Sequence, residues 1–407
     1  MFPPKGFKTR VFIDLPKETY SFRKDLKINP SQVIAFNTDT RNSTNLQIEN
    51  QYNNLFGRHK WIFDQCNLFK KVDSTARGNL GFEINLILNK MNLPYAFICI
   101  SYPELNRTQQ NGILTANDVP IDLGKDIDQL FPNFKSQINK LLEIQSKLKT
   151  GLITLKQISK GTKYLLTSIQ NLIDAETKII CFDAVTRSDI DQISEVITKY
   201  FAQGMLVGSA GLAKSISKSF VGQCSHKRRR VNQFKKPFAL ISLSSHQITR
   251  AHFKTLSNSN QMQHISIHNH ALSCKENFEE EYSRISSIID EAIVSKQNIT
   301  LNQSSISTCN NSIPNTASKT LNTFLSKISL KLINSEFFQT FILIGGDTAK
   351  TFLQGASIEE IDVLDEVLPG TVIGIPSPKH HKTFTIITKS GGFGDKNHLT
   401  ELLSKLL

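Results

Sequence analysis

The chain contains 407 residues with a mass of 45.8 kDa, which exceeds one ordinary hydrophobic core and suits two domains. Hydrophobic residues make up 39% and charged residues 20% of the sequence, a balance that excludes an intrinsically disordered chain. The longest apolar runs have the length of buried strands, so we expect no membrane-spanning segment. The six cysteines are scattered and include no CxxC pair, and the start of the sequence has no apolar leader. We therefore expect a soluble cytoplasmic protein.

The formal net charge of +13 would suit an anionic partner. Only one dense basic run occurs, Lys227–Arg230, and aromatic residues do not alternate with it as a base-stacking platform requires. Nucleic-acid binding is therefore the less favoured interpretation, and a salt-dependent shift with DNA or RNA would test it.

Short apolar runs alternate with longer amphipathic stretches, which is typical of strand–helix–strand units. In the first half the expected strands are Thr9–Leu15, Gln32–Phe36, Leu68–Val72, Tyr95–Ile100, Lys178–Phe182 and Gly204–Val207. The expected helices are Gly81–Met91, Phe134–Lys149, Ile158–Ile173 and Ser188–Phe201, each with apolar residues at helical spacing.

A polar and basic stretch without periodicity then separates the two halves of the chain. We expect a substrate domain of residues 1–225, a basic linker of residues 226–236 and a nucleotide domain of residues 237–407. The later expected elements are the strands Phe238–Leu243, Phe341–Ile344 and Thr383–Thr388, the helix Phe278–Ser295 and a terminal helix. The fold class predicted is α/β, with two domains that are each a mainly parallel sheet flanked by helices.

Charged and hydroxyl side chains follow several predicted strands of the first half. These candidate residues are Arg41, Lys71, Asp73, Ser74, Arg77 and Arg107. Arginine can hold a carboxylate by two parallel hydrogen bonds, and Asp or Ser can bind sugar hydroxyls, so an acidic sugar would suit this rim. The alternative is a helix entry in which Asp73 or Ser74 is the N-cap and Arg77 is solvated.

Glycine turns follow the strands of the second half, where backbone N–H groups and a helix N-terminus can bind phosphate. The residues concerned are Gly345, Gly346, Asp347 and Thr348, then Glu366 and Gly370, then Lys389, Gly391, Gly392 and Gly394. Asp347 is expected as a helix N-cap, and the alternative is a contact to magnesium through one of the ion's own ligands. The Walker A pattern GxxxxGK[ST] does not occur, and a glycine turn alone is more often structural.

The histidines His264, His268 and His270 are closely spaced, but no second ligand cluster accompanies them in the sequence. A zinc site usually takes ligands from two segments, so no protein-held metal site is predicted.

Seven motifs taken together resemble the four-carbon acid sugar kinase family. They are KVDSTARGN at Lys71–Asn79, Pro103–Gly112 with Arg107, FDAVTRSD at Phe182–Asp189, VGSAGLA at Val207–Ala213, GGDTA at Gly345–Ala349, EVLPG at Glu366–Gly370 and KSGGFG at Lys389–Gly394. They occur in the family's order and span nearly the whole chain.

This resemblance implies ATP- and magnesium-dependent phosphorylation of a tetronate or 3-oxo-tetronate, with a substrate domain first and a nucleotide domain second. It places substrate contacts on the charged residues of the first half, and nucleotide contacts on Ser244 and the glycine-turn residues of the second. A small sugar acid and ATP are then the partners, with a homo-oligomer as a further possibility.

Two departures from the family pattern leave an alternative open. No Asp-Asp-x-Thr-Gly segment occurs before Thr9, so the general base is left unassigned. Leu243-Ser244 also stands where relatives carry Gly-Ser, which would place a branched side chain at a nucleotide loop. The alternative to an active kinase is a truncated or degenerate homologue that keeps the fold, and possibly ligand binding, without catalysis.

Overall fold

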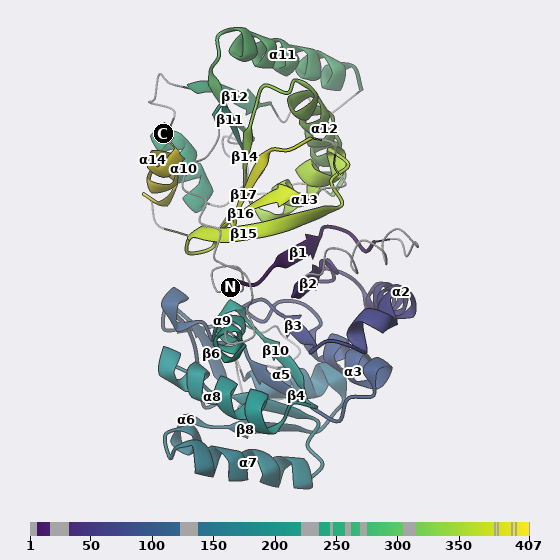
Figure 1. Cartoon of the computed structure of the whole chain (residues 1–407), viewed down its shortest axis with the longest axis vertical. Helices are drawn as coiled ribbons and strands as arrows, with labels where there is room; N and C mark the ends of the chain where they lie inside the picture. The colour runs from purple at the N-terminus through teal and green to yellow at the C-terminus, as the bar shows by residue number, and fades with distance from the viewer. Residues whose placement is uncertain are drawn as a thin grey trace. The chain divides into compact units, whose positions relative to one another are not determined.

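The computed structural model describes residues 6–16, 32–122, 137–220, 236–244, 247–256, 262–268, 275–303, 315–377, 380, 382–391, 394 and 397–406. These residues form two compact units (Figure 1). The first unit contains the described residues between 38 and 220, and the second contains residues 6–16, 32–37 and those from 236 onward. Of the expected linker, only Lys236 lies inside the described residues.

The elements of the first unit alternate between helix and strand. They are α2 (Asn45–Phe63), β3 (Phe69–Lys71), α3 (Leu80–Met91), β4 (Ala96–Cys99), η2 (Pro103–Leu105), β5 (Arg107–Gln110), β6 (Ile113–Ala116), β7 (Val119–Pro120), α5 (Ile138–Ser146), β8 (Thr150–Ile153), α6 (Leu155–Ile158), α7 (Thr162–Asp174), β9 (Ile179–Phe182), α8 (Arg187–Tyr200), β10 (Met205–Gly208) and α9 (Ala210–Ser219).

The main sheet of this unit has five parallel strands in the order β3-β10-β4-β9-β8. Its central strands are buried throughout, as expected when helices cover both faces. Helices α7, α8 and α9 contribute to one cluster with Phe97 and Phe182, whereas α3 packs against α5. The close α3–α5 approach requires Gly81, because a Cβ there would lie 2.7 Å from the carbonyl oxygen of Leu142.

Helix α8 shows how local sequence defines an element. Thr186 and Asp189 form a capping box at its N-terminus, and its apolar residues at positions 190, 193, 196 and 197 are all fully buried. The helix therefore begins one residue before the expected Ser188 and covers the sheet with a single face.

The second unit is built on one large sheet. Its elements are β1 (Thr9–Phe12), β2 (Val33–Phe36), β11 (Phe238–Ser242), α10 (Gln247–Leu256), β12 (Met262–Ile267), α11 (Lys275–Val294), β13 (Asn298–Gln303), α12 (Asn315–Asn334), β14 (Thr340–Ile344), α13 (Gly346–Gly355), β15 (Glu360–Leu368), β16 (Thr371–Pro376), β17 (Thr385–Lys389) and α14 (His398–Leu406).

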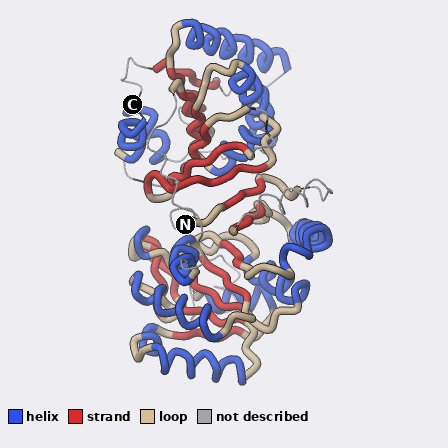
Figure 2. The backbone as a smooth tube through the Cα atoms, in the orientation of Figure 1, coloured by secondary structure: helices blue, strands red, loops and turns tan. Residues whose placement is uncertain are grey.

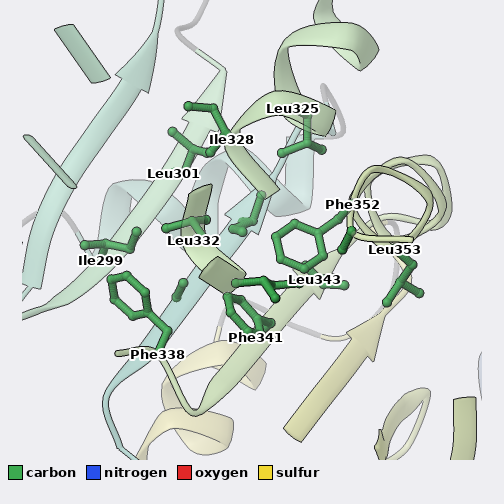
Figure 3. Packing of buried hydrophobic residues seen from close by; sticks show 14 of the residues in the cluster. Ile299, Leu301, Leu325, Ile328, Leu332, Phe338, Phe341, Leu343, Phe352 and Leu353 are labelled. Atoms are coloured by element: carbon green, nitrogen blue, oxygen red, sulfur yellow. The ribbon is translucent and has the colours of Figure 1, made fainter. Parts of the chain in front are cut away.

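The nine strands lie in the order β12-β13-β11-β14-β17-β16-β15-β1-β2. The first five are parallel, and β16 and β15 extend the sheet in antiparallel fashion. Alternate residues of β14 enter two different cores: Phe341 packs with α11, α12 and α13, and Ile342 packs with α10 and α14. Helices thus cover both faces of the parallel region (Figure 2). In the core beneath α12 and α13, Phe341 packs against Phe352 (Figure 3), and the two ring centroids lie 5.0 Å apart.

The N-terminal strands are placed differently from the sequence-based expectation, which assigned them to the first domain. Strand β1 pairs antiparallel with β15 and parallel with β2 in the nine-stranded sheet. A buried ion-pair cluster accompanies this pairing. The Arg10 side chain is 1% exposed, its Nε lies 2.8 Å from Asp362 Oδ1, and its Nη1 lies 3.7 Å from Glu360 Oε2. Arg10 thus has carboxylate partners on β15, and these contacts accompany the backbone pairing that places β1 in the second unit.

All nine strands expected from sequence are present, and the two α/β sheets flanked by helices confirm the predicted fold class. Several elements were not predicted, including the helix α2 and the antiparallel hairpin of β15 and β16. The polar segment 298–318 contributes strand β13 at one end and the start of α12 at the other.

Candidate functional site

The charged candidates of the first unit follow β3, at the carboxyl edge of the parallel sheet. Strand β3 pairs with β10, and the Val72 nitrogen donates to the Gly208 oxygen at 2.9 Å. The helices after these two neighbouring strands, α3 and α9, pack into different clusters. Adjacent strands whose connections leave in opposite directions open a ligand-binding crevice at their carboxyl ends.

The loop between β3 and α3 curls back on itself. Ala76 and Gly78 adopt left-handed backbone conformations, with φ of 57° and 102°. A non-glycine residue in this region is strained, and such residues gather at functional sites. The curl lets Arg77 Nε donate to Asp73 Oδ2 at 2.5 Å, while the Thr75 hydroxyl donates to the same oxygen at 2.6 Å. The alternative interpretation, in which Asp73 or Ser74 is the N-cap, is wrong, since Asn79 is the N-cap residue of α3.

Arg41 belongs to the same cluster. A Cβ added at Gly78 would lie 3.4 Å from the carbonyl oxygen of Arg41, so the two loops are in contact. Burial alone would raise the pKa of Asp73, but hydrogen bonds from Arg77 and Thr75 and the charges of Arg77 and Arg41 outweigh it and lower the pKa. The structure therefore brings Arg41, Asp73 and Arg77 together.

Lys71 shares this electrostatic environment. Lys71 is exposed at the end of β3, and the protein atoms around its ammonium displace enough water to lower its pKa; Arg41, Lys70 and Arg77 lower the pKa further, and Asp73 acts in the opposite direction. Three cations, Arg41, Lys71 and Arg77, thus surround one carboxylate, and an incoming anion would relieve their mutual repulsion.

Ser74 and Arg107 have different surroundings. Ser74 is half-buried in the curled loop beside Asp73. Arg107 begins strand β5 of the small antiparallel sheet, and its guanidinium donates to the backbone oxygens of Leu105 and Asn106 at 3.5 and 3.4 Å. The structure thus gives Arg107 partners in its own turn.

The nucleotide candidates Ser244, Gly345–Thr348, Lys389 and Gly391 lie at the carboxyl ends of β11, β14 and β17, which are neighbouring parallel strands. Helix α10 after β11 and helix α13 after β14 pack into cores on opposite faces of the sheet. This is again a point where connections leave in opposite directions.

Helix α13 begins at this edge. Its N-cap is Gly345, with a left-handed φ of 102°, and the expected N-cap role of Asp347 is therefore wrong. Asp347 is exposed in the first turn, and a Cβ added at Gly346 would meet no atom within 4 Å. The N-terminus of α13 is therefore open, and its backbone N–H groups and dipole can bind an anion.

Ser244 and Gly391 line the same edge at close range. A Cβ added at Gly391 would lie 2.6 Å from Ser244 Oγ, and one added at Gly345 would lie 3.5 Å from Ser244 Cβ. Thr249 Oγ1 donates to the Gly391 oxygen at 2.8 Å, and the Leu243 nitrogen donates to Thr348 Oγ1 at 3.0 Å. We call Ser244, Gly345, Thr348 and Gly391 the glycine cradle.

The side chain of Leu243 does not enter the cradle as expected from sequence. It packs against the core cluster beneath α11, α12 and α13, while its backbone nitrogen bonds to Thr348. The backbone of this loop therefore approaches the cradle closely with leucine at position 243.

Lys389 ends β17 beside the cradle, and the Gly345 nitrogen donates to its carbonyl oxygen at 2.8 Å. The residue is 2% exposed, and its Nζ donates to the Ser390 oxygen at 3.1 Å. Burial lowers the pKa of the Lys389 ammonium to about 8. A bound phosphate would stabilise the charged form of this amine.

The remaining glycine-motif residues lie around the neighbouring strand β16. Glu366 accepts a hydrogen bond from the Gly370 nitrogen at 2.8 Å, so its carboxylate closes the turn between β15 and β16. Thr371 pairs in register with Lys389 and its hydroxyl lies 2.8 Å from His398 Nε2. A Cβ added at Gly394 would lie 2.5 Å from the His398 ring. Gly392 lies outside the described residues.

Three residues at this edge were missed from sequence: Thr249, Thr371 and His398. All three are buried. Only Thr249 had a signal in the sequence that could have identified it, a hydroxyl in the first turn of a helix that follows a strand.

Within the described ranges, no helix is long and apolar enough to cross a membrane. Nor do the residues with known placement include a group of three or more His, Cys, Asp or Glu side chains arranged to hold a metal ion.

Comparison with known proteins finds two family models in succession along the chain. A family model described as a sugar-binding N-terminal domain matches residues 1–216, and one described as a nucleotide-binding C-terminal domain matches residues 239–399. A D-threonate kinase of Salmonella typhimurium is 24% identical over 351 residues, which cover 83% of this chain and 79% of that protein. A D-erythronate kinase of Heliobacterium modesticaldum is 26% identical over 197 residues, or 47% of this chain and 42% of the relative.

Solved structures show the same fold at low sequence identity. A Salmonella typhimurium protein described as a tRNA synthase has a TM-score of 0.79 at 16% identity, covering 99% of this chain and 94% of that one. A Haemophilus influenzae protein from a domain family of unknown function has a TM-score of 0.71 at 17% identity, covering 100% and 96%. With both family models matched in order, the chain belongs to the four-carbon acid sugar kinase family.

Proposed function

We propose that this protein transfers the γ-phosphoryl group of ATP to a hydroxyl of a four-carbon sugar acid, a tetronate or 3-oxo-tetronate. The observation that carries the proposal is the glycine cradle at the open N-terminus of α13. At Gly391 a Cβ would meet Ser244 Oγ at 2.6 Å, so the loops that carry these two residues can approach this closely only while residue 391 is glycine. Bare backbone donors at a helix N-terminus suit a phosphate chain.

Lys389 supplies the cationic group of this cradle. Because its pKa is about 8, the amine is mostly protonated at neutral pH, and a nearby phosphate would hold it fully charged. Phosphoryl transfer depends chiefly on positioning and on neutralising charge at the transferring group, which are the contributions a buried cation and backbone donors make.

The sugar acid is assigned to the charged cluster of the first unit. Arg77 uses Nε on Asp73, and its terminal nitrogens can donate to a substrate carboxylate together with Arg41 and Lys71. Asp73 and Ser74 would accept from sugar hydroxyls. Arg107 is kept as a weaker candidate, because its guanidinium already bonds to its own turn.

Magnesium fits this arrangement as an ion that arrives with the nucleotide. Mg²⁺ commonly keeps several waters and is held by substrate phosphates with one or two carboxylates. Asp347, exposed in the first turn of α13, is the carboxylate at that edge that could contact it or its waters. The ion would neutralise charge on the phosphates.

The test is an assay of ADP release coupled to NADH oxidation, with ATP, Mg²⁺ and each of D-threonate, D-erythronate and their 3-oxo forms. Calorimetric titrations with ATP and with each acid accompany it. Turnover of one acid supports the proposal. Binding of both ligands without turnover identifies the alternative, a homologue that binds without catalysis. The absence of binding for ATP and for all four acids would refute the proposal.

The homo-oligomer suggested by the sequence stays a prediction. Light scattering coupled to size-exclusion chromatography, with and without ligands, measures the mass directly.

A further inference from the structure

A buried network of four polar side chains lies beneath the charged cluster of the first unit. Glu83, in the first turn of α3, accepts three hydrogen bonds on a single oxygen, Oε2. The donors are Thr40 Oγ1 at 2.9 Å, Tyr52 OH at 2.7 Å and Lys70 Nζ at 2.6 Å. Lys70 Nζ also donates to Tyr52 OH at 2.8 Å, so the network is closed.

The network lies within the protein core. The side chain of Glu83 is 3% exposed and that of Lys70 is 10% exposed, and Thr40 and Tyr52 are buried. Burial raises the pKa of Tyr52 to about 12. For Lys70 burial alone would lower the pKa, but Tyr52 and Glu83 outweigh it and raise the pKa, so the amine stays charged.

Stability alone is a weak reason for such an arrangement. A buried ion pair loses so much hydration that replacing it with apolar residues of similar volume is often neutral or stabilising. The position of two of the four residues along the chain suggests another role, because Thr40 and Lys70 each directly precede a cation of the charged cluster.

Thr40 precedes Arg41 on one loop, and Lys70 precedes Lys71 at the end of β3. Glu83 itself follows the curled loop that carries Asp73 and Arg77. One carboxylate therefore ties together the three backbone segments from which the cluster's side chains project. Thr38 Oγ1 lies 3.3 Å from Thr40 Oγ1 and extends the bonded chain along the first of these segments.

We infer that Glu83 is a positioning residue for sugar-acid binding, which holds the segments of Arg41 and Lys71 in place through Thr40 and Lys70. The inference rests on the proposed function. A cluster of like charges repels itself, so a fixed framework is needed to keep three cations converging on one carboxylate. Holding these side chains before the ligand arrives reduces the entropy lost on binding.

The sharpest test removes one hydrogen bond and leaves the ion pair intact. Thr40→Val keeps the shape of the side chain and deletes its donor to Glu83, whereas Thr40→Ser keeps the donor. Thr150→Val is the matched control, because the Thr150 hydroxyl also donates to a partner, the Asn139 oxygen at 3.2 Å, but on strand β8 at the far edge of the same sheet.

Calorimetry would measure the dissociation constants of D-threonate, D-erythronate and MgATP for each variant, with the melting temperature measured in parallel. We expect Thr40→Val to weaken acid binding about three- to tenfold, as loss of one buried hydrogen bond implies. Thr40→Ser and Thr150→Val should bind the acid as the wild type does, and MgATP affinity should be unchanged throughout. A purely stabilising role would instead lower the melting temperature without this selective loss.

Glu83→Gln provides a second variant, because its amide oxygen can still accept a bond while the charge opposite Lys70 is lost. We expect weaker acid binding with MgATP affinity retained. If the wild type binds an acid and both Thr40→Val and Glu83→Gln bind it equally well, the inference is wrong and the proposed function stands. If the wild type binds no tetronate at millimolar concentration, the proposed function fails and the inference fails with it.

Discussion

The backbone nitrogen of Gly345 donates a hydrogen bond to the carbonyl oxygen of Lys389 at 2.8 Å. This bond joins two glycine motifs that are more than forty positions apart in the sequence, at the carboxyl ends of the paired strands β14 and β17. The N-terminus of α13 at Gly345 and the end of β17 at Lys389 therefore lie at the same edge of the sheet. Two of the predictions below concern this edge.

Gly391→Ala should weaken MgATP binding. The added Cβ would lie 2.6 Å from Ser244 Oγ, and relieving such a contact typically costs about 1–3 kcal/mol. The measurement is a calorimetric titration with MgATP, accompanied by a melting curve. Gly57→Ala is the control: a Cβ there meets nothing within 4 Å inside helix α2, so it should raise stability by roughly 0.5–1 kcal/mol. Unchanged MgATP affinity in Gly391→Ala would contradict the cradle.

Lys389→Met should remove most MgATP affinity and alter the pH dependence of stability. The folded-state pKa of Lys389 is about 8, below the value of 10.5 for an exposed lysine. Below pH 8 the amine is protonated in both the folded and the unfolded chain, so the cost of burying its charge is fully present. Between pH 8 and 10.5 the folded chain has released the proton and the unfolded chain has not, so the cost disappears as pH rises.

Chemical denaturation of both proteins from pH 7 to 10.5 checks this sign. The free energy of unfolding of the wild type should rise relative to that of Lys389→Met over this range. A constant difference between the two proteins would show that burial does not lower the pKa of Lys389.

Arg77→Met should weaken binding of the sugar acid while changing stability little. A hydrogen bond to a charged group contributes about 1.5–3 kcal/mol, whereas an exposed ion pair such as Arg77–Asp73 contributes about 0–1 kcal/mol. Arg77→Lys should retain part of the affinity, because it keeps the charge without the planar fork. Titration with D-threonate and D-erythronate measures the effect, and Arg58→Met on exposed α2 surface is the matched control. Equal losses from both methionine variants would point to net charge alone.

Arg10→Met should destabilise the second unit by about 3–5 kcal/mol, because it leaves the carboxylates of Asp362 and Glu360 without their buried cation. Adding Asp362→Leu to this variant should recover part of the loss. Urea denaturation monitored by circular dichroism provides the free energies. A loss below about 1 kcal/mol, the level typical of exposed ion pairs, would be inconsistent with β1 pairing on β15.

Much of the fold could be predicted from the sequence because its signals are local. Apolar runs of four to six residues between amphipathic stretches predicted strands such as β4, β9 and β14, and the structure confirms them. Helical spacing of apolar residues predicted α8 to within one residue at each end. Strand β8 was missed because Thr150–Ile153 contains only two apolar residues, and it is recruited by parallel pairing with β9.

The sheet to which a strand belongs is not a local property. Strand β1 resembles an ordinary apolar run in the sequence, and its backbone pairing with β15, together with the contact of Arg10 with Asp362, 352 positions away, places it in the second unit. The sequence alone likewise shows which residue types the candidate loops carry: arginines after β2 and β3, and glycines after β14 and β17. Tertiary structure decided which of them meet. It brought Arg41 to Asp73 and Arg77 but gave Arg107 other partners. It also placed Ser244 against Gly391. These outcomes are not visible in the sequence because strand order and the buried network of Glu83 depend on contacts between distant segments.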